Sequence, residues 1–428
     1  MSRASAVVRA LRHRNYQLFF SGQLISLIGT WMQNVAQSWL VYRLTGSSLL
    51  LGLVGFANQI PIFLLAPVGG AVADRWSRRR IVIGTQTGSM ILALILAGIT
   101  LLGFVQVWHV VVLAALLGVV NAFDVPARQA FVVEMVGQEH LQNAIALNSS
   151  LFNGARIVGP AVAGVLVAAI GEGWCFFANG VSYIAVIAGL LLMRLEPRPG
   201  QPKPGSALAH MVEGFEFAWR TRPIRALLLQ LGVGSLMGMP YAVLMPIFAD
   251  RILHSGPRGL GFLMGASGIG ALGGAIALAM RHGLHGMGRR MAYAAACFGS
   301  CLILFSFSRS FWLSVALLVP AGFAFITQMA STNTLIQSMV PDRLRGRVMA
   351  VYSMMFMGMA PLGALGAGFT ASRLSAPAAV RIGGAACILS ALVFGSRLSS
   401  LRAESRQLIL DQQMAHADPD GAETGKML

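Results

Sequence analysis

The sequence predicts an all-α membrane protein with twelve transmembrane helices in two pseudo-symmetric six-helix halves. Three observations lead to this fold class. The chain of 428 residues is 56% hydrophobic and only 11% charged. Apolar runs of about twenty residues recur along it, which is the length that an α-helix needs to cross a bilayer. Short basic segments separate these runs, as the positive-inside rule expects of a polytopic membrane protein.

The apolar runs define the expected spans and the domain boundaries. The spans of the first half are expected at 16–43, 48–73, 81–104, 107–134, 141–170 and 174–193. Those of the second half are expected at 224–250, 258–281, 289–308, 310–338, 345–372 and 376–398. The chain thus divides into an N-terminus (1–15), a first half (16–193), a linker (194–222), a second half (223–398) and a disordered tail (399–428).

The basic residues predict the orientation of the chain. Of the 32 basic residues, 25 lie in segments that this topology places inside and six lie in outer segments. Both termini are therefore expected in the cytoplasm. The formal net charge of +17 has the same origin. No basic face is interleaved with exposed aromatic residues, so no nucleic-acid partner is expected.

The sequence lacks the residue patterns of an enzyme or a metalloprotein. It has no Walker motif, so ATP is not expected to supply energy to this chain, and no His, Cys and carboxylate cluster has metal-ligand spacing. The four cysteines lie in or beside apolar runs, and we interpret them as small core residues. We expect a non-enzymatic protein without a cofactor or a metal.

The linker combines an extended segment with an amphipathic helix. Closely spaced prolines between positions 197 and 204 favour extended backbone. Downstream, Val212, Phe215 and Trp219 fall on one helix face, and Glu216 precedes Arg220 at a favourable i,i+4 spacing. Such a helix is expected to lie at the cytoplasmic membrane surface between the two halves.

A charged turn between the second and third spans has a distinctive pattern. The run from Gly69 to Arg80 reads Gly-Gly-Ala-Val-Ala-Asp-Arg-Trp-Ser-Arg-Arg-Arg. Glycine permits close helix packing, and the aspartate can hold an arginine in an ion pair. The pattern resembles the signature loop of the major facilitator superfamily, where this loop latches against the other half of the protein. The resemblance implies a cytoplasmic gate formed by Gly70, Asp74, Arg75, Arg78 and Arg79. A loop that only sets the orientation is the alternative.

Polar residues recur along one face of several spans. In the first span they follow each other at three- and four-residue steps, and the tenth span has a similar stripe. A polar face inside a membrane needs water or another helix, so these residues either line a substrate cavity or bond helices together. We interpret them as cavity candidates: Gln33, Asn34, Gln37, Asn58, Gln59, Asn148, Asn153, Gln230, Gln328 and Asn333.

Ionisable residues within spans are rarer and mark candidate functional sites. From the helix rise, Asp124 lies about 25 Å and Arg156 about 21 Å from the outer ends of their helices. Adjacent antiparallel helices would bring them to similar depth. We predict an Asp124–Arg156 pair, with Arg128 as a competing partner one turn from Asp124. Protonation of Asp124 would release its partner and couple proton uptake to helix movement, whereas a static pair would only fix packing.

The fifth span resembles a motif of major facilitator antiporters. Gly159, Pro160 and Gly164 fit the glycine-proline pattern of that motif, and Gly154 extends it, whereas Arg156 is not part of it. The runs from Ala122 to Ala130 and from Asn143 to Arg156 resemble enterobactin-exporter-like and macrolide-efflux-like permeases of bacteria. One departure is that Trp108 to Leu117 lacks the arginine of drug/proton antiporters, which moves attention to Asp124 and Arg156.

The resemblance implies a secondary exporter in the bacterial inner membrane. It would move a small amphiphilic molecule, a drug or a siderophore, out of the cytoplasm by alternating access in exchange for protons. Its partners would be the substrate, protons and the lipid bilayer, and we expect a monomer. A lipid or lysophospholipid flippase and a non-transporting sensor of the same fold are the alternatives.

Overall fold

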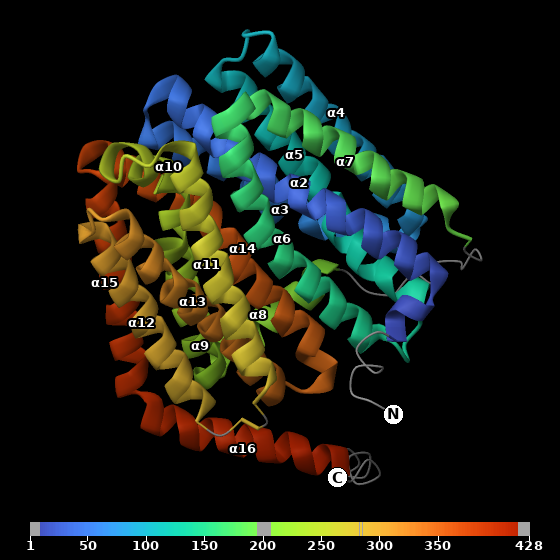
Figure 1. The fold of residues 1–428 in the computed structure, drawn as a ribbon. Coiled ribbons are helices and arrows are strands. Elements are labelled where there is room, and N and C mark those ends of the chain that lie inside the picture. Colours follow the sequence, from blue (N-terminus) through green and yellow to red (C-terminus); the bar gives the residue numbers. More distant parts are fainter. Residues whose placement is uncertain (1–8, 195–206, 282, 285, 418–428) are drawn as a thin grey trace.

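A computed structural model describes residues 9–194, 207–281, 283–284 and 286–417, with the side chains of residues 9, 207–211 and 411–417 left aside (Figure 1). Long helices make up this part of the chain, which contains no strand. The first group of helices is α2 (Arg14–Thr45), α3 (Ser48–Arg75), α4 (Arg78–Leu101), α5 (Val107–Val136), α6 (Leu141–Ile170) and α7 (Glu172–Leu192), preceded by the 3₁₀ turn η1 (Arg9–Arg12).

The second group follows the linker helix α8 (Ala207–Arg220) and begins with α9 (Arg222–Val233). It continues through the irregular segments η2 (Gly234–Gly238), η3 (Met239–Leu244), α10 (Met245–Ile247) and η4 (Phe248–Ile252). It ends with α11 (Gly256–Ala279), α12 (Met287–Phe307), α13 (Phe311–Met339), α14 (Asp342–Arg373), α15 (Ala376–Ser396) and α16 (Leu398–Ala417).

The described helices agree with the predicted twelve spans. Eleven of them, with Arg222–Ile252 counted as one, are long and apolar enough to cross a membrane. The 32-residue helix α2 is also long enough, but the polar stripe along it lowers its hydropathy. With α2 added, the fold is compatible with twelve spans.

The seventh span is continuous but changes its helix type. The segment η2 is a π-helix and η3 is a 3₁₀-helix, and Pro240 lies at the start of η3. Proline has no backbone N–H and cannot continue regular α-helical hydrogen bonding. Glycines on neighbouring helices let this backbone come close: a Cβ at Gly363 or Gly383 would lie 2.3 or 2.1 Å from the carbonyl oxygens of Leu236 and Met237. The irregular segment is therefore packed between α14 and α15.

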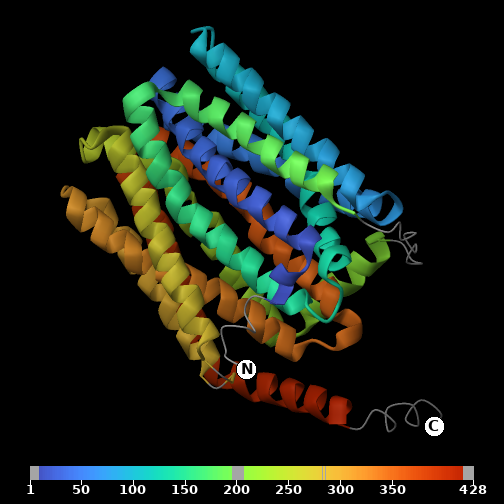
Figure 2. The same ribbon diagram turned by 45° about the vertical axis from the view of Figure 1, so that its right-hand side comes forward.

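The two groups of helices meet through α3 with α14 and through α6 with α11 (Figures 1 and 2). We call the end that carries the α3–α4 loop the inner end. Near the outer end, Gly52 lies against Gly368, where a Cβ on the latter would stand 3.0 Å from the Gly52 α-carbon. In the middle of the pair, Gly358 lies against the Phe63 ring.

Polar contacts reinforce the outer end. The Tyr42 hydroxyl donates to Asp250 at 2.7 Å, and the Ser48 hydroxyl donates to the Gly368 carbonyl at 3.1 Å. Arg251 donates to the Gly46 carbonyl at 3.3 Å. Each of these bonds joins a residue of the first group to one of the second, so the outer end is closed.

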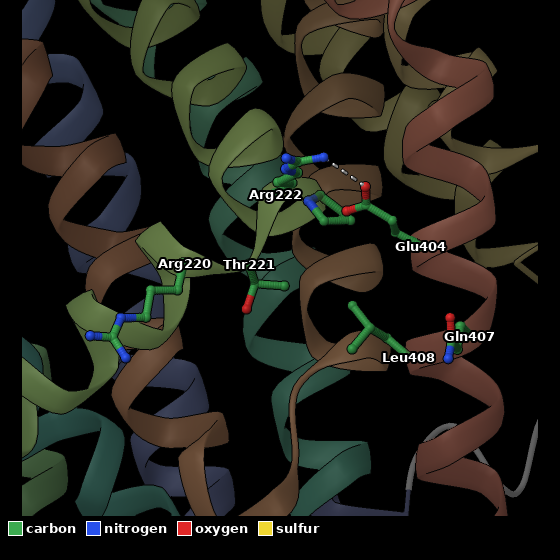
Figure 3. A pocket seen from close by; sticks show the side chains of 7 residues that line it. Arg220, Thr221, Arg222, Glu404, Gln407 and Leu408 are labelled. Carbon is green, nitrogen blue, oxygen red and sulfur yellow. Dashed lines mark ion pairs between the residues drawn. The ribbon is translucent and has the colours of Figure 1, made fainter.

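The tail was expected to be disordered, but residues Leu398–Ala417 form α16, which runs across one end of the molecule (Figure 1). Apolar residues of its first turns explain the difference, because Leu401 and Leu408 pack on the second group of helices. Figure 3 shows a pocket between α16 and the α8–α9 turn, in which Glu404 pairs with Arg222 at 3.6 Å. Residues 418–428 lie outside the described residues.

The amphipathic helix predicted in the linker is α8. Its Glu216–Arg220 pair is present at 2.8 Å. Glu213 pairs with Arg343, at 2.9 Å, and with Arg347, which docks α8 on the inner end of α14.

Candidate functional site

The close helix approach at the α3–α4 loop is made by Gly69, not by Gly70. A Cβ at position 69 would lie 2.1 Å from the Ala122 carbonyl oxygen of α5, whereas one at Gly70 would meet nothing within 4 Å. Pro126 lies four residues after Ala122 and has no N–H to donate to that carbonyl. The close helix contact in the gate motif is therefore made by Gly69, one position before the predicted Gly70.

Two arginines of this loop fasten the helices around it. Arg78 donates to Glu134 near the inner end of α5 at 2.9 Å. Arg79 donates to the carbonyls of Leu190 and Leu191 at 2.8 and 3.0 Å. These carbonyls belong to the last turn of α7, where no N–H within the helix can reach them. Both arginines thus hold the inner ends of first-group helices together.

The acidic residue of the loop does not form the ion pair expected of it. Asp74 and Arg75 are exposed, and within the described residues neither has a hydrogen bond or an ion pair. The contacts between α3 and α14 described above lie in the outer and middle parts of these helices. The expected contact of Asp74 and Arg75 with the other half is therefore not made in this structure.

Asp124 is the centre of a buried polar cluster on α5. It is 2% exposed, and its carboxylate pairs with Arg128 at 3.2 Å. Thr85 and Gln86 of α4 donate to the carboxylate at 2.7 and 3.0 Å. Arg128 also donates to Gln23 of α2 at 3.1 Å. One carboxylate thus binds groups from α4 and α5 directly and reaches α2 through Arg128.

A second group of polar side chains continues from this cluster toward the outer end. Asn179 of α7 donates to Gln33 of α2 at 2.6 Å. The hydroxyl of Tyr183 lies near the polar side chains of Asn179, Thr30 and Ser89. The Asp124 carboxylate is also nearby. Buried polar groups of three helices therefore lie next to one another inside the first group.

The predicted Asp124–Arg156 pair is wrong. Asp124 pairs with Arg128, the competing partner, and among the described residues no carboxylate pairs with Arg156. Similar depth does not bring two side chains together: α6 packs on α2 and α11, whereas α5 packs on α3 and α4. The Arg156 guanidinium instead lies over the Trp31 ring, 5.7 Å from its centroid.

The antiporter-like motif of α6 places its glycines against two helices. A Cβ at Gly159 would lie 2.9 Å from a carbonyl oxygen of α2. A Cβ at Gly164 would lie 3.1 Å from the α-carbon of Gly261 in α11, and one at Gly261 would lie 2.5 Å from the Pro160 carbonyl oxygen. Gly154 has open space on its Cβ side. The motif thus holds α6 against both groups of helices.

The cavity candidates separate by burial. Gln33, Gln37, Gln230 and Gln328 are buried, and the Gln328 amide donates to the Gln230 carbonyl at 3.4 Å. These residues fit the alternative interpretation, bonding between helices. The remaining candidates are partly or fully exposed: Asn34, Asn58, Gln59, Asn148, Asn153 and Asn333.

Three of the partly exposed candidates make hydrogen bonds with other residues of the protein. Tyr16 donates to Asn148 at 3.3 Å, and Asn153 donates to the Ser149 carbonyl at 2.8 Å. Asn333 accepts from Gln337 one turn further along α13. Such bonds leave part of each amide free to contact a ligand.

Sequence reasoning missed Gln86, Thr85 and Asn179 as functional candidates. Gln23 lies on the polar stripe of the first span, but the cavity candidates named from the sequence include no residue of the third or sixth span. Gln86 is buried in a span where amides are rare, and that rarity was a usable signal.

The fold is shared with multi-pass membrane transporters. The solved structure of the nucleoside transporter NupG superposes with a TM-score of 0.69 at 14% identity, covering 90% of this chain and 98% of that chain. Residues 5–418 match the family described as transmembrane secretion effector, and the chain belongs to this family of the major facilitator superfamily.

Named relatives span most of the chain. The multidrug efflux pump Tap of Mycolicibacterium fortuitum is 29% identical, with 78% of this chain and 83% of that protein covered. The staphyloferrin A transporter of Staphylococcus aureus is 26% identical, with 81% and 87% covered. The enterobactin exporter EntS of Shigella boydii is 25% identical, with 84% and 86% covered. The predicted resemblance to this branch of exporters is confirmed.

Proposed function

We propose that this protein is a secondary active exporter that moves a small amphiphilic molecule out of the bacterial cytoplasm in exchange for protons. The observation that carries the proposal is the burial of Asp124 in a cluster linking α2, α4 and α5. A buried carboxylate inside a membrane helix is costly and marks a functional site. The efflux and export activities named for the relatives support the direction.

Asp124 is the proposed proton acceptor. As a carboxylate it accepts hydrogen bonds from Thr85 and Gln86 and pairs with Arg128. Protonation removes the negative charge, so the attraction to Arg128 is lost and one oxygen becomes a donor. The contacts between α4 and α5 then change at the depth where Gly69 packs on Ala122. Proton binding would in this way alter the position of α3 and its inner loop.

In alternating access, the outer end and the inner end of the transporter would close in turn. In this structure the bonds between Tyr42 and Asp250 and between Ser48 and Gly368 hold the outer end together. Asp74 and Arg75 at the inner end, which have no partner among the described residues, would bind the second half when the outer end opens. The loop thereby acts as the cytoplasmic latch that its pattern predicts.

The names of the relatives and the partly exposed amide side chains support the proposed substrate class. The relatives are named for drugs in one case and for siderophores in two. Partly exposed amides such as Asn58, Gln59 and Asn148 supply neutral donors and acceptors suited to amphiphilic molecules. The basic inner segments put both termini in the cytoplasm, and the chain would act as a monomer in the inner membrane.

The test is pH-gradient-driven transport in proteoliposomes. Wild type, Asp124→Asn and Glu404→Gln are reconstituted, and efflux of ethidium and of a catecholate siderophore is followed with and without the gradient. The matched control removes a surface carboxylate that pairs with Arg222. We expect gradient-dependent efflux of at least one of the two probes in wild type and Glu404→Gln, and its loss in Asp124→Asn.

Other results would change the proposal. Gradient-dependent efflux in a normally folded Asp124→Asn protein would make Asp124 structural. Movement of fluorescent lysophospholipid without efflux of either probe would favour a flippase. No flux of any probe would favour a sensor.

A further inference from the structure

Arg156 occupies the midpoint of α6 (Leu141–Ile170), and at that depth a positive charge needs a counter-charge. Asp124, a carboxylate buried in the same group of helices, is already paired with Arg128. Within the described residues, no carboxylate lies in ion-pair range of Arg156 and no hydrogen bond to its guanidinium is present. The side chain is packed among protein atoms but keeps part of its surface exposed. Its charge is therefore available to a ligand.

Aromatic side chains stand around this charge. The guanidinium lies 5.7 Å from the centroid of the Trp31 ring, and Trp31 meets Phe152 edge-on at 5.5 Å. Stacking on an indole holds an arginine in place while leaving its N–H donors free. An arginine positioned in this way presents a planar set of donors that matches a carboxylate.

The second group of helices contributes to the same place. Tyr241 of η3 lies near Arg156, and its hydroxyl shares a hydrogen bond with Ser267 of α11 at 2.8 Å. The α6 backbone is close as well, since a Cβ at Gly268 would lie 3.1 Å from the Arg156 carbonyl oxygen. The charge thus stands where the two groups meet, the location of substrate sites in transporters built from repeats.

We propose that Arg156 binds the carboxylate of an organic anion, whose apolar part lies against Trp31 and Phe152. The inference rests on the proposed transport function and specifies its substrate class. Arg156 forms the ion pair, and the Tyr241–Ser267 hydroxyl pair supplies a neutral donor from the other half. A cationic drug of similar size would meet an uncompensated positive charge there.

The test is equilibrium binding to the purified full-length protein in detergent, without a gradient. The probes are radiolabelled salicylate, citrate and tetraphenylphosphonium. Wild type is compared with Arg156→Gln, Arg156→Lys and Arg381→Gln. The matched control is also an arginine stacked on an aromatic ring, 4.9 Å from the centroid of Phe307. Size exclusion and thermal unfolding verify that each variant is folded.

We expect saturable binding of at least one carboxylate to wild type and to Arg381→Gln. Arg156→Gln should weaken it by about tenfold or more, while Arg156→Lys, which keeps the charge, should weaken it less. Equal carboxylate affinity in wild type and Arg156→Gln would overturn the proposal. So would tight tetraphenylphosphonium binding without carboxylate binding, or displacement of the carboxylate by phosphatidylglycerol but not by unlabelled salicylate.

This test separates the site from the transport function. Carboxylate binding by a protein that moves no probe across a membrane would retain the anion site and reject the exporter. Ethidium efflux by a protein that binds no carboxylate would do the reverse.

Discussion

Gly69 of α3 lies so close to Ala122 of α5 that a Cβ on the glycine would stand 2.1 Å from the alanine carbonyl oxygen. Two residues that follow each other in the chain, Gly69 and Gly70, therefore have opposite surroundings. This contact joins the gate segment to the helix that carries Asp124.

Replacing Gly69 should separate these two helices. We expect Gly69→Ala to lower the free energy of unfolding by about 1–3 kcal/mol, because the methyl group forces α3 away from α5. Gly70→Ala is the matched control and should have little effect, since nothing lies within 4 Å of its Cβ position. Thermal unfolding followed by size exclusion measures both. Equal losses in the two variants would contradict the packing role of Gly69.

The Asp124–Arg128 pair should show strong coupling in a double-mutant cycle. Arg128→Gln leaves a buried carboxylate without its cation, and we expect a loss of roughly 3–5 kcal/mol. Asp124→Asn leaves Arg128, which is more exposed and still bonded to Gln23. The free energy of unfolding should therefore fall less in Asp124→Asn than in Arg128→Gln. The double variant should be more stable than Arg128→Gln alone. Additive losses in denaturant unfolding would show that the two side chains do not interact.

The outer-end bond between Tyr42 and Asp250 should set the balance between the closed and open outer end. Tyr42→Phe removes a hydrogen bond to a charged group, which is worth about 1.5–3 kcal/mol, so the population of the outer-open state should rise at least several-fold. Distances between spin labels at Leu49→Cys and Leu374→Cys, in a variant without its natural cysteines, measure the opening.

The control for this experiment is Thr45→Val. The Thr45 hydroxyl donates to the Val41 carbonyl and accepts from the Ser47 N–H. Neither bond reaches the second group of helices, so the distance distribution should not change. An unchanged distribution in Tyr42→Phe as well would mean that the bond does not hold the outer end.

Docking of α8 on α14 should depend on Glu213. Glu213→Gln weakens its bonds to Arg343 and Arg347, and we expect a few-fold faster cleavage by trypsin after Arg220, because the helix is released. Glu216→Gln is matched in charge and position, but its pair with Arg220 stays within α8. Equal cleavage rates in these two variants would exclude docking through Glu213.

The spans could be predicted because their signal is local. Arg78 and Arg79 stand just before the apolar run that starts at Ile81, and α4 begins at Arg78. The partner of Asp124 could not be obtained in the same way. The depth of a residue in the membrane follows from the number of residues along its helix, but the direction of its side chain depends on which helices pack together. In α6 the Arg156 side chain lies over the Trp31 ring.

Two further differences have physical reasons of the same kind. The tail has a polar composition, but a few apolar residues such as Leu401 find a surface on the helix bundle, and they order α16. The choice between Gly69 and Gly70 depends on where the Ala122 carbonyl points, which no pattern in the sequence reports.

The irregular seventh span also bears on how the protein is made. In Arg222–Ile252, 61% of the most apolar window is buried by protein, compared with 22% in Ser48–Arg75. Its π-helical backbone packs against Gly363 and Gly383, which belong to helices that leave the ribosome later. During synthesis this segment therefore enters the membrane before α14 and α15, the helices it packs against, are present. Its native geometry can be completed only after α15 has been inserted, so assembly of the second half ends with the packing of its first helix.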